Sequence, residues 1–208
     1  FAKSALKTVG IVSETTGYFA HQIQVKFRAI SFDFAASTCE EYQPLFDELY
    51  NYEIGVLVNN VGVSIDCPEI LHKVHGEKAE LARISTVNTL PMLLLSSAVL
   101  EFMALRKSGV VINITSGCFN SSAPFWNVYA ASKNYTLQLS KALRGEYSSH
   151  GVTIHTLTPL RVATKSLVPN VDKPSFFIPS PEKYARSALR TVGIISRTAG
   201  CFAHQLQV

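Results

Sequence analysis

Val56-Leu57-Val58-Asn59-Asn60-Val61-Gly62 is a short apolar run that passes into two amides and a glycine. A run of this kind is typical of a strand that is buried on both faces, as in the middle of a parallel sheet. Further apolar runs lie at 109–114 and 151–157, and residues 28–34 alternate as a strand does. We therefore predict four strands from these segments.

Longer segments of helical pattern separate the predicted strands. We predict helices over residues 40–52, 77–106 and 126–148. Strands that alternate with helices favour a parallel sheet with helices on both faces. The sequence therefore predicts a protein of the α/β class.

The ends of the predicted strands carry polar residues. The ligand of an open parallel sheet binds beyond the carboxyl ends of its strands. Asp33, Asn60 and Ser116 each fall at a predicted strand end, and Pro159 stops the strand at 151–157. We expect a site where these strand ends meet.

Tyr129 and Lys133 are four residues apart within the predicted helix 126–148. Residues at this spacing share one helix face, so the phenol and the ammonium point into the same space. A neighbouring cation favours the phenolate, and such a tyrosine exchanges a proton with a carbonyl or alcohol oxygen. The hydroxyl of Ser116, thirteen residues upstream, can hold that oxygen by a hydrogen bond. Surface helices often show the same spacing by chance, so the chemistry depends on the serine and the strand ends.

The composition limits the class of protein. Of the 208 residues, 47% are apolar and 16% are charged, which fits one globular domain with a sizeable core. The net charge of +4 is spread without basic runs, so we expect no nucleic-acid partner. We also expect no membrane span in this chain, because its most apolar run, 90–100, is too short to cross a bilayer.

The cysteine and histidine pattern argues against a metal site. No C-x-x-C occurs, so we expect free thiols in a reducing compartment. His72 and His75 could share a helix face, but no cysteine or carboxylate cluster accompanies them. We therefore predict no metal. The four cysteines are widely spaced: Cys39, Cys67, Cys118 and Cys201.

Residues 1–25 repeat residues 184–208. Aligned without gaps, 17 of the 25 positions are identical. Two copies are too few for a solenoid. We predict that 1–25 is a duplicated end segment, a helix followed by a strand, and that it precedes an incomplete domain spanning 26–208.

Several motifs follow one another in a fixed order: Asn59-Asn60-Val61-Gly62, Asn88, Ser116, Tyr129-x-x-x-Lys133 and Pro159-Leu160-x-Val162-x-Thr164. Their order resembles that of the short-chain dehydrogenases/reductases. The stretches 57–62 and 187–193 are similar to the subgroup of 17β-hydroxysteroid dehydrogenases of types 3 and 12 and very-long-chain 3-oxoacyl-CoA reductases. The resemblance covers about 26–208 and implies a Rossmann-like, doubly wound parallel sheet.

The resemblance implies catalytic roles for four residues. Tyr129 would be the general acid/base, and Lys133 would support it and hold the ribose next to the nicotinamide, so that both contact the cofactor. Ser116 would orient the substrate oxygen, and Asn88 would anchor a water that relays protons to Lys133. Two of these residues have an ordinary alternative: Asn88 as a polar residue bonded locally within a helix, and Ser116 as a turn residue.

The resemblance also implies a binding site for NADP(H). Asp33 would meet the adenine, although aspartate at a strand end is often only a turn residue. Asn59 and Asn60 would support the adenosine end and the central sheet. Val162 and Thr164 would contact the carboxamide of the nicotinamide.

The sequence departs from the family at the first motif. Members begin with a strand, a T-G-x-x-x-G-x-G turn and a helix whose N-terminus receives the pyrophosphate. No G-x-G occurs in this sequence, the first two strands of the family are missing, and the repeated segment stands in their place. We therefore expect impaired binding of NADP(H) and an open edge on the strand at 55–61. Residues 18–25 are candidates to fill that gap.

Three hypotheses for the function follow. The first is an NADP(H)-dependent oxidoreductase that reduces a ketone or oxidises a hydroxyl on a steroid or fatty-acyl substrate. The second is an inactive relative that binds or dimerises, and the third is a non-functional product of a rearranged gene. We expect a small apolar substrate, and helices 77–106 and 126–148 are candidates for a homodimer interface. The resemblance implies a location at the endoplasmic reticulum, whereas the chain alone predicts the cytosol.

The segment 166–179 is either a lid beside the site or an ordinary surface loop.

Overall fold

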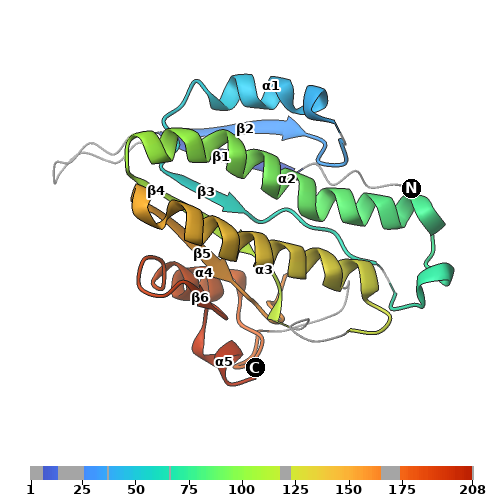
Figure 1. The fold of residues 1–208 in the computed structure, drawn as a ribbon. Coiled ribbons are helices and arrows are strands. Elements are labelled where there is room, and N and C mark those ends of the chain that lie inside the picture. The colour runs from blue at the N-terminus through green and yellow to red at the C-terminus, as the bar shows by residue number, and fades with distance from the viewer. Residues whose placement is uncertain are drawn as a thin grey trace.

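The computed structural model describes residues 7–13, 26–36, 38–65, 67–117, 123–164 and 174–207. Its centre is a parallel sheet of four strands in the order β3-β4-β5-β6 (Figure 1). Each predicted strand of this sheet lies within about two residues of its expected bounds. The strands predicted with bounds are β3 (Val56–Asn59), β4 (Gly109–Ile114) and β5 (Val152–Leu157). The fourth strand is β6 (Arg197–Thr198), for which we predicted no bounds.

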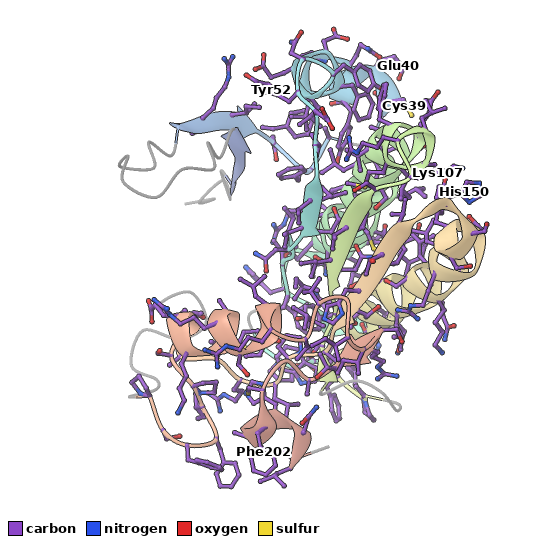
Figure 2. All side chains as sticks on the ribbon, turned by 90° about the vertical axis from the view of Figure 1, so that its left-hand side faces the viewer. Cys39, Glu40, Tyr52, Lys107, His150 and Phe202 are labelled. Atoms are coloured by element: carbon purple, nitrogen blue, oxygen red, sulfur yellow. The ribbon has the colours of Figure 1, made fainter. Side chains whose placement is uncertain are left out.

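Helices cover both faces of this sheet. The long helices α2 (Glu77–Leu105) and α3 (Asn127–Tyr147) pack side by side on one face, and α4 (Pro181–Leu189) lies on the other (Figures 1 and 2). This arrangement confirms the predicted α/β class and the helices at 77–106 and 126–148. The core under α2 and α3 is apolar, and Leu100, Met103 and Val111 are almost fully buried in it.

A second, smaller unit packs beside β3. It contains β1 (Lys7–Ser13), β2 (Lys26–Phe32) and α1 (Cys39–Leu49), and β1 and β2 pair antiparallel in a sheet of their own. The helix α1 begins with a capping box, in which Thr38 Oγ1 accepts from the backbone N–H of Glu41 at 3.3 Å. Such a cap satisfies N–H groups that the first helical turn leaves unpaired.

The pairing of β2 differs from the prediction. We expected residues 28–34 to belong to the parallel sheet, but β2 pairs with β1 and with no other described strand. Backbone N–H and C=O groups need partners, and among the described residues no strand of the parallel sheet pairs with β2. The antiparallel partner β1 supplies those hydrogen bonds instead.

The strand β3 forms an open edge of the parallel sheet. Among the described residues it pairs only with β4. Val56 and Val58, which alternate along it, are 56% and 51% exposed. The prediction of an open edge at this strand is therefore confirmed for the described part of the chain, whereas the expectation of a strand buried on both faces was wrong. Residues 18–25, expected as a filler, lie outside that part.

The two copies of the repeat adopt different local structures where both are described. In the C-terminal copy, α4 is followed by a turn, by β6 and by α5 (Phe202–Gln205). The helix-then-strand order holds there. Residues 190–196 form the turn after α4, with Gly193 at a φ of 79°, whereas the equivalent residues Lys7–Ser13 form β1. The assignment of 1–25 as a separate unit stays a prediction.

The helix α2 has the length and composition of a membrane-crossing helix between Lys78 and Leu105. The apolar run at 90–100 is part of this longer helix, so our argument from its short length was wrong. Half of the most apolar window of α2 is nevertheless buried inside the structure, and the helix contacts α3, β3 and β4. A buried core helix meets the same criterion, and α2 packs as one.

His155 links the centre of β5 to the turn after α4. Its side chain is fully buried, with Nδ1 2.8 Å from the carbonyl oxygen of Ile195 and Nε2 3.2 Å from Thr191 Oγ1. Burial lowers the pKa of this imidazole, and the nearby Arg144 adds a smaller lowering. The folded protein therefore holds His155 neutral more strongly than the unfolded chain does.

We expect this burial to make the folded state sensitive to acid. The unfolded imidazole has an ordinary pKa of about 6.5, so its contribution to stability is fully present above that pH. The contribution is lost as the pH falls through the lower folded pKa. Urea unfolding at pH 7 and pH 5 should show the loss, and His155→Leu should weaken this pH dependence. His150→Gln, at an exposed histidine, should leave it unchanged; the opposite ranking of the two variants would contradict the assignment.

Candidate active site

Tyr129 and Lys133 lie one turn apart on the face of α3 that meets the sheet. The Nζ atom of Lys133 is 5.6 Å from the centre of the Tyr129 ring. The two side chains therefore lie next to each other, as their i, i+4 spacing predicts. Lys133 is only 7% exposed, and its Nζ donates to the carbonyl oxygen of Ile114 at 3.5 Å. A buried ammonium needs such partners because burial without them is costly. The ammonium is therefore held at the carboxyl end of β4.

The end of β4 is attached to the same turn of α3. Thr115 Oγ1 donates to the backbone oxygen of Lys133 at 2.7 Å, and the backbone N–H of Thr115 donates to the oxygen of Leu157 at 2.9 Å. Ser116 follows directly and is half-buried. The structure thus brings the strand end that carries Ser116 against the turn that carries Lys133.

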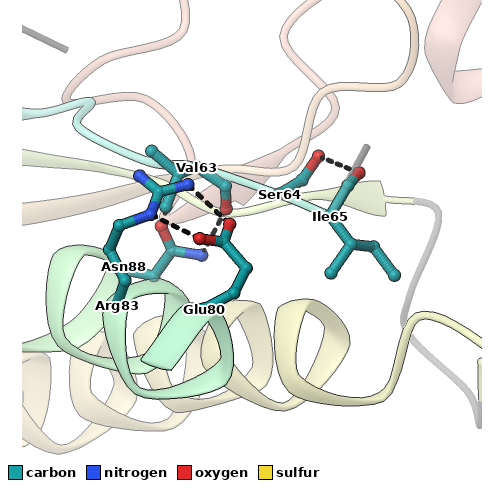
Figure 3. Close-up of polar contacts among 6 residues, drawn as sticks. All are labelled: Val63, Ser64, Ile65, Glu80, Arg83 and Asn88. Carbon is teal, nitrogen blue, oxygen red and sulfur yellow. Dashed lines mark hydrogen bonds and ion pairs between the residues drawn. The ribbon is translucent and has the colours of Figure 1, made fainter. Parts of the chain in front are cut away.

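Asn88 joins three elements from its position on α2. It is 4% exposed. Its Oδ1 accepts from the N–H of Val63 at 2.7 Å, and its Nδ2 donates to the oxygen of Val63 and to Ser132 Oγ, both at 2.9 Å. Figure 3 shows the reciprocal pair with Val63, on the segment that follows β3. The amide therefore fixes both that segment and the turn of α3 between Tyr129 and Lys133.

Gly62 passes directly over the ammonium of Lys133. A Cβ atom at this glycine would lie 3.0 Å from Lys133 Nζ and 3.4 Å from Asn88 Oδ1. Contacts this short leave little space for any side chain. The absence of a side chain at Gly62 therefore lets the segment after β3, α2 and α3 meet around one cation.

Asn59 has a structural position beneath this site. Its Nδ2 donates to Asn113 Oδ1 at 2.8 Å and to Ser96 Oγ at 3.1 Å. Asn113 in turn donates to Ser140 Oγ at 2.9 Å. These amides and hydroxyls connect β3 and β4 to α2 and α3.

Comparisons with known proteins agree with this arrangement. A model of the family described as short chain dehydrogenase matches residues 6–174. The chain belongs to the short-chain dehydrogenase family.

Curated relatives show which members of the family this short-chain dehydrogenase resembles in sequence. The very-long-chain 3-oxoacyl-CoA reductase of Caenorhabditis briggsae is 44% identical over 184 residues, which cover 88% of this chain and 58% of the relative. A Caenorhabditis elegans protein named as a steroid dehydrogenase is 40% identical over 187 residues, with coverages of 89% and 58%. The chain thus spans about 58% of the length of these curated relatives.

One solved structure supports the same fold. A metagenomic short-chain oxidoreductase in complex with NADP superposes with a TM-score of 0.55 at 27% identity. The match covers 62% of this chain and 57% of that structure.

The residues expected to contact the cofactor of a short-chain dehydrogenase are spread over several elements. Asn60 is exposed just after β3, and Val162 and Thr164 are half-buried on the segment after β5. Asp33 follows β2, outside the parallel sheet, and its Oδ1 accepts from the N–H of Ala35 at 3.0 Å. That contact is the turn that we gave as the ordinary alternative for Asp33. The roles of these four residues toward a cofactor stay predictions.

Sequence reasoning missed several residues that hold the site together. Ser132 lies inside the Tyr129–Lys133 motif and accepts from Asn88, while its own hydroxyl donates to the oxygen of Tyr129 at 2.7 Å. Thr115 immediately precedes Ser116. Both are small hydroxyl residues beside residues that we singled out, and that adjacency was the available signal. Across the described residues, no group of three or more potential metal ligands occurs.

Replacement of Asn88 should destabilise the protein strongly. Asn88→Ala leaves the N–H and C=O of Val63 and the hydroxyl of Ser132 without their partner in a buried site. We expect a loss of about 2–3 kcal/mol in the free energy of unfolding, measured by urea denaturation. Ser85→Ala, at an exposed position of the same helix, is the control and should change stability by less than about 0.5 kcal/mol. Equal effects of the two variants would show that the Asn88 contacts are not important.

Proposed function

We propose that this chain is an oxidoreductase that interconverts a ketone and a hydroxyl group on a steroid or fatty-acyl substrate with NADP(H). The observation that carries the proposal is the placement of Lys133 Nζ 5.6 Å from the ring of Tyr129, at the carboxyl ends of β3 and β4. The names of the relatives, a 3-oxoacyl-CoA reductase and a steroid dehydrogenase, support the substrate class.

In this proposal, Tyr129 exchanges the proton of the reaction. During reduction, its hydroxyl gives a proton to the carbonyl oxygen as that oxygen gains negative charge, and during oxidation it takes the proton back. Lys133 stabilises the phenolate that this transfer produces. The hydroxyl of Ser116 donates a hydrogen bond to the reacting oxygen. A nicotinamide cofactor, when bound, supplies or accepts the hydride.

The residues present fit the nicotinamide end of such a cofactor. The ammonium of Lys133 is a donor suited to ribose hydroxyls, and it lies beside the bare backbone of Gly62. Val162 and Thr164 are candidates to bind the carboxamide from the segment after β5. These groups support binding of the reactive half of NADP(H).

The pyrophosphate end of the cofactor lacks an equivalent site. The sequence contains no G-x-G turn, and among the described residues one edge of β3 has no neighbouring strand. A glycine-rich turn before a helix supplies the N–H groups that bind pyrophosphate in this type of fold. We therefore propose that this chain binds NADP(H) weakly.

Turnover by the purified chain tests the reaction. With NADPH at millimolar concentration and either a steroid ketone or a 3-oxoacyl-CoA, we expect slow oxidation of NADPH, followed by absorbance. Tyr129→Phe should reduce the rate at least about a hundredfold, because it removes the proton donor. Tyr135→Phe changes a more exposed tyrosine on the same helix and should retain activity. A Tyr129→Phe variant as active as the parent would refute the assignment.

Fluorescence titration with NADPH tests the strength of cofactor binding. We expect a dissociation constant about a hundredfold or more above that of a relative with the glycine-rich turn, since several charge-assisted hydrogen bonds are missing. Tight binding would overturn this part of the proposal. Absence of both binding and turnover would favour the inactive relative, which the missing turn supports.

Two further parts of the proposal concern assembly and location. The helices α2 and α3 expose Leu93, Phe102 and Tyr135, and we propose them as the faces of a homodimer. The resemblance also supports the endoplasmic reticulum as the location.

A further inference from the structure

The segment that follows β5 contacts the turn that carries Ser116. The N–H of Gly117 donates to the carbonyl oxygen of Pro159 at 2.9 Å. A Cβ atom at Gly117 would lie 2.9 Å from the oxygen of Thr158 and 3.0 Å from Leu160 Cδ2. The two segments therefore touch backbone to backbone, and a shift of residues 158–160 must move the residue next to Ser116.

His204 of α5 holds the same segment from the other side. Its ring is fully buried. Its Nδ1 is 3.2 Å from the backbone nitrogen of Leu160, and its Nε2 is 3.0 Å from the carbonyl oxygen of Arg161. The N–H of Leu160 can only donate and the carbonyl of Arg161 can only accept. The contacts therefore assign a neutral ring with its proton on Nε2.

The segment 197–205 is itself firmly attached, so His204 is a fixed support. The backbone oxygen of Thr198 accepts from the N–H and the hydroxyl of Thr158, at 2.8 and 3.2 Å. Thr198 Oγ1 accepts from the N–H of Gly200 and from Gln205 Nε2, both at 3.1 Å. The ring of Tyr184 packs 5.5 Å from that of His204, and burial raises the pKa of this phenol, which keeps it neutral.

We propose that His204 is a positioning residue of the reductase site, and this inference rests on the proposed function. By holding Leu160 and Arg161, it fixes the segment that leads into Val162 and Thr164. Through Pro159 and Gly117 it also fixes the turn of Ser116. An aromatic ring without nitrogens would take the place of the imidazole but would remove the partner of two partly buried backbone groups.

The repeat provides a matched control for His204. Residues 19–22 and 202–205 are the same tetrapeptide, Phe-Ala-His-Gln, so His21→Phe makes the same chemical change in the same local sequence. His21 lies outside the described residues. The proposal assigns the contact with Leu160 to His204 alone, and His21→Phe should therefore behave as the parent chain.

The first experiment is independent of activity. We expect His204→Phe to increase the exchange rate of the Leu160 amide at least about tenfold in NMR hydrogen exchange, because that N–H loses its acceptor. Nitrogen spectra of the parent chain should show an unprotonated Nδ1 at His204. Should His204→Phe fail to fold, His204→Gln tests the same point, since its amide reaches only the Arg161 side. Unchanged exchange at Leu160 in a folded variant, or faster exchange in His21→Phe instead, would overturn the proposal.

The second experiment measures kinetics with NADPH and a ketone. His204→Phe should lower kcat on the order of tenfold, because a small displacement of Ser116 misaligns the substrate. His204→Asn, which keeps an acceptor near Leu160, should recover part of the loss. Faster exchange without any change in kcat or KM would leave His204 a structural residue and contradict the proposal. Complete inactivity of the parent chain would refute the proposed function, while the exchange experiment would still decide whether His204 holds Leu160.

Discussion

The hydrogen bond between the amides of Asn59 and Asn113 is the contact on which the arrangement of the site depends. It joins β3 to β4 at 2.8 Å, and the same two amides reach Ser96 on α2 and Ser140 on α3. Because β3 has only four residues and one described neighbour, its ladder alone holds it weakly. Hydrogen bonds between buried side chains favour one arrangement of the strands and helices over others. The network therefore sets where β3 ends, and with it the position of the segment that crosses Lys133.

Side chains of the neighbouring helices and strands hold each segment of the site in place. The segment after β3 is held by Asn88, and the two hydrogen bonds to Val63 leave its backbone little freedom. Thr115 ties the end of β4 to α3 at Lys133. Together these contacts hold a buried ammonium beside a phenol. The proposed proton transfer by Tyr129 rests on this arrangement, in which Lys133 Nζ lies 5.6 Å from the centre of the Tyr129 ring.

Features formed within one helix could be predicted from the sequence, whereas contacts between distant segments could not. The helices at 77–106 and 126–148 are long and periodic, so their bounds could be predicted to within one or two residues. The pair Tyr129–Lys133 could be predicted because one helix carries both. The pairing of β2 with β1 could not, since it depends on which strand is available rather than on residues 28–34. His204 could not be predicted either, because its partner Leu160 is 44 residues away and nothing local marks the contact.

The repeat shows how far tertiary contacts decide local structure in this chain. Lys7–Ser13 and residues 190–196 are nearly identical, yet the first segment is a strand and the second is the turn after α4. In the second copy, the hydroxyl of Thr191 and the oxygen of Ile195 contact His155 on β5, and Ala188 packs on β4 and β5. The parallel sheet contains only one set of these contact residues. Because the C-terminal copy already binds them, the N-terminal copy cannot bind them as well. Its backbone groups must pair elsewhere, and the unpaired edge of β2 accepts them. The same sequence therefore supports the site at one end of the chain and completes a separate sheet at the other.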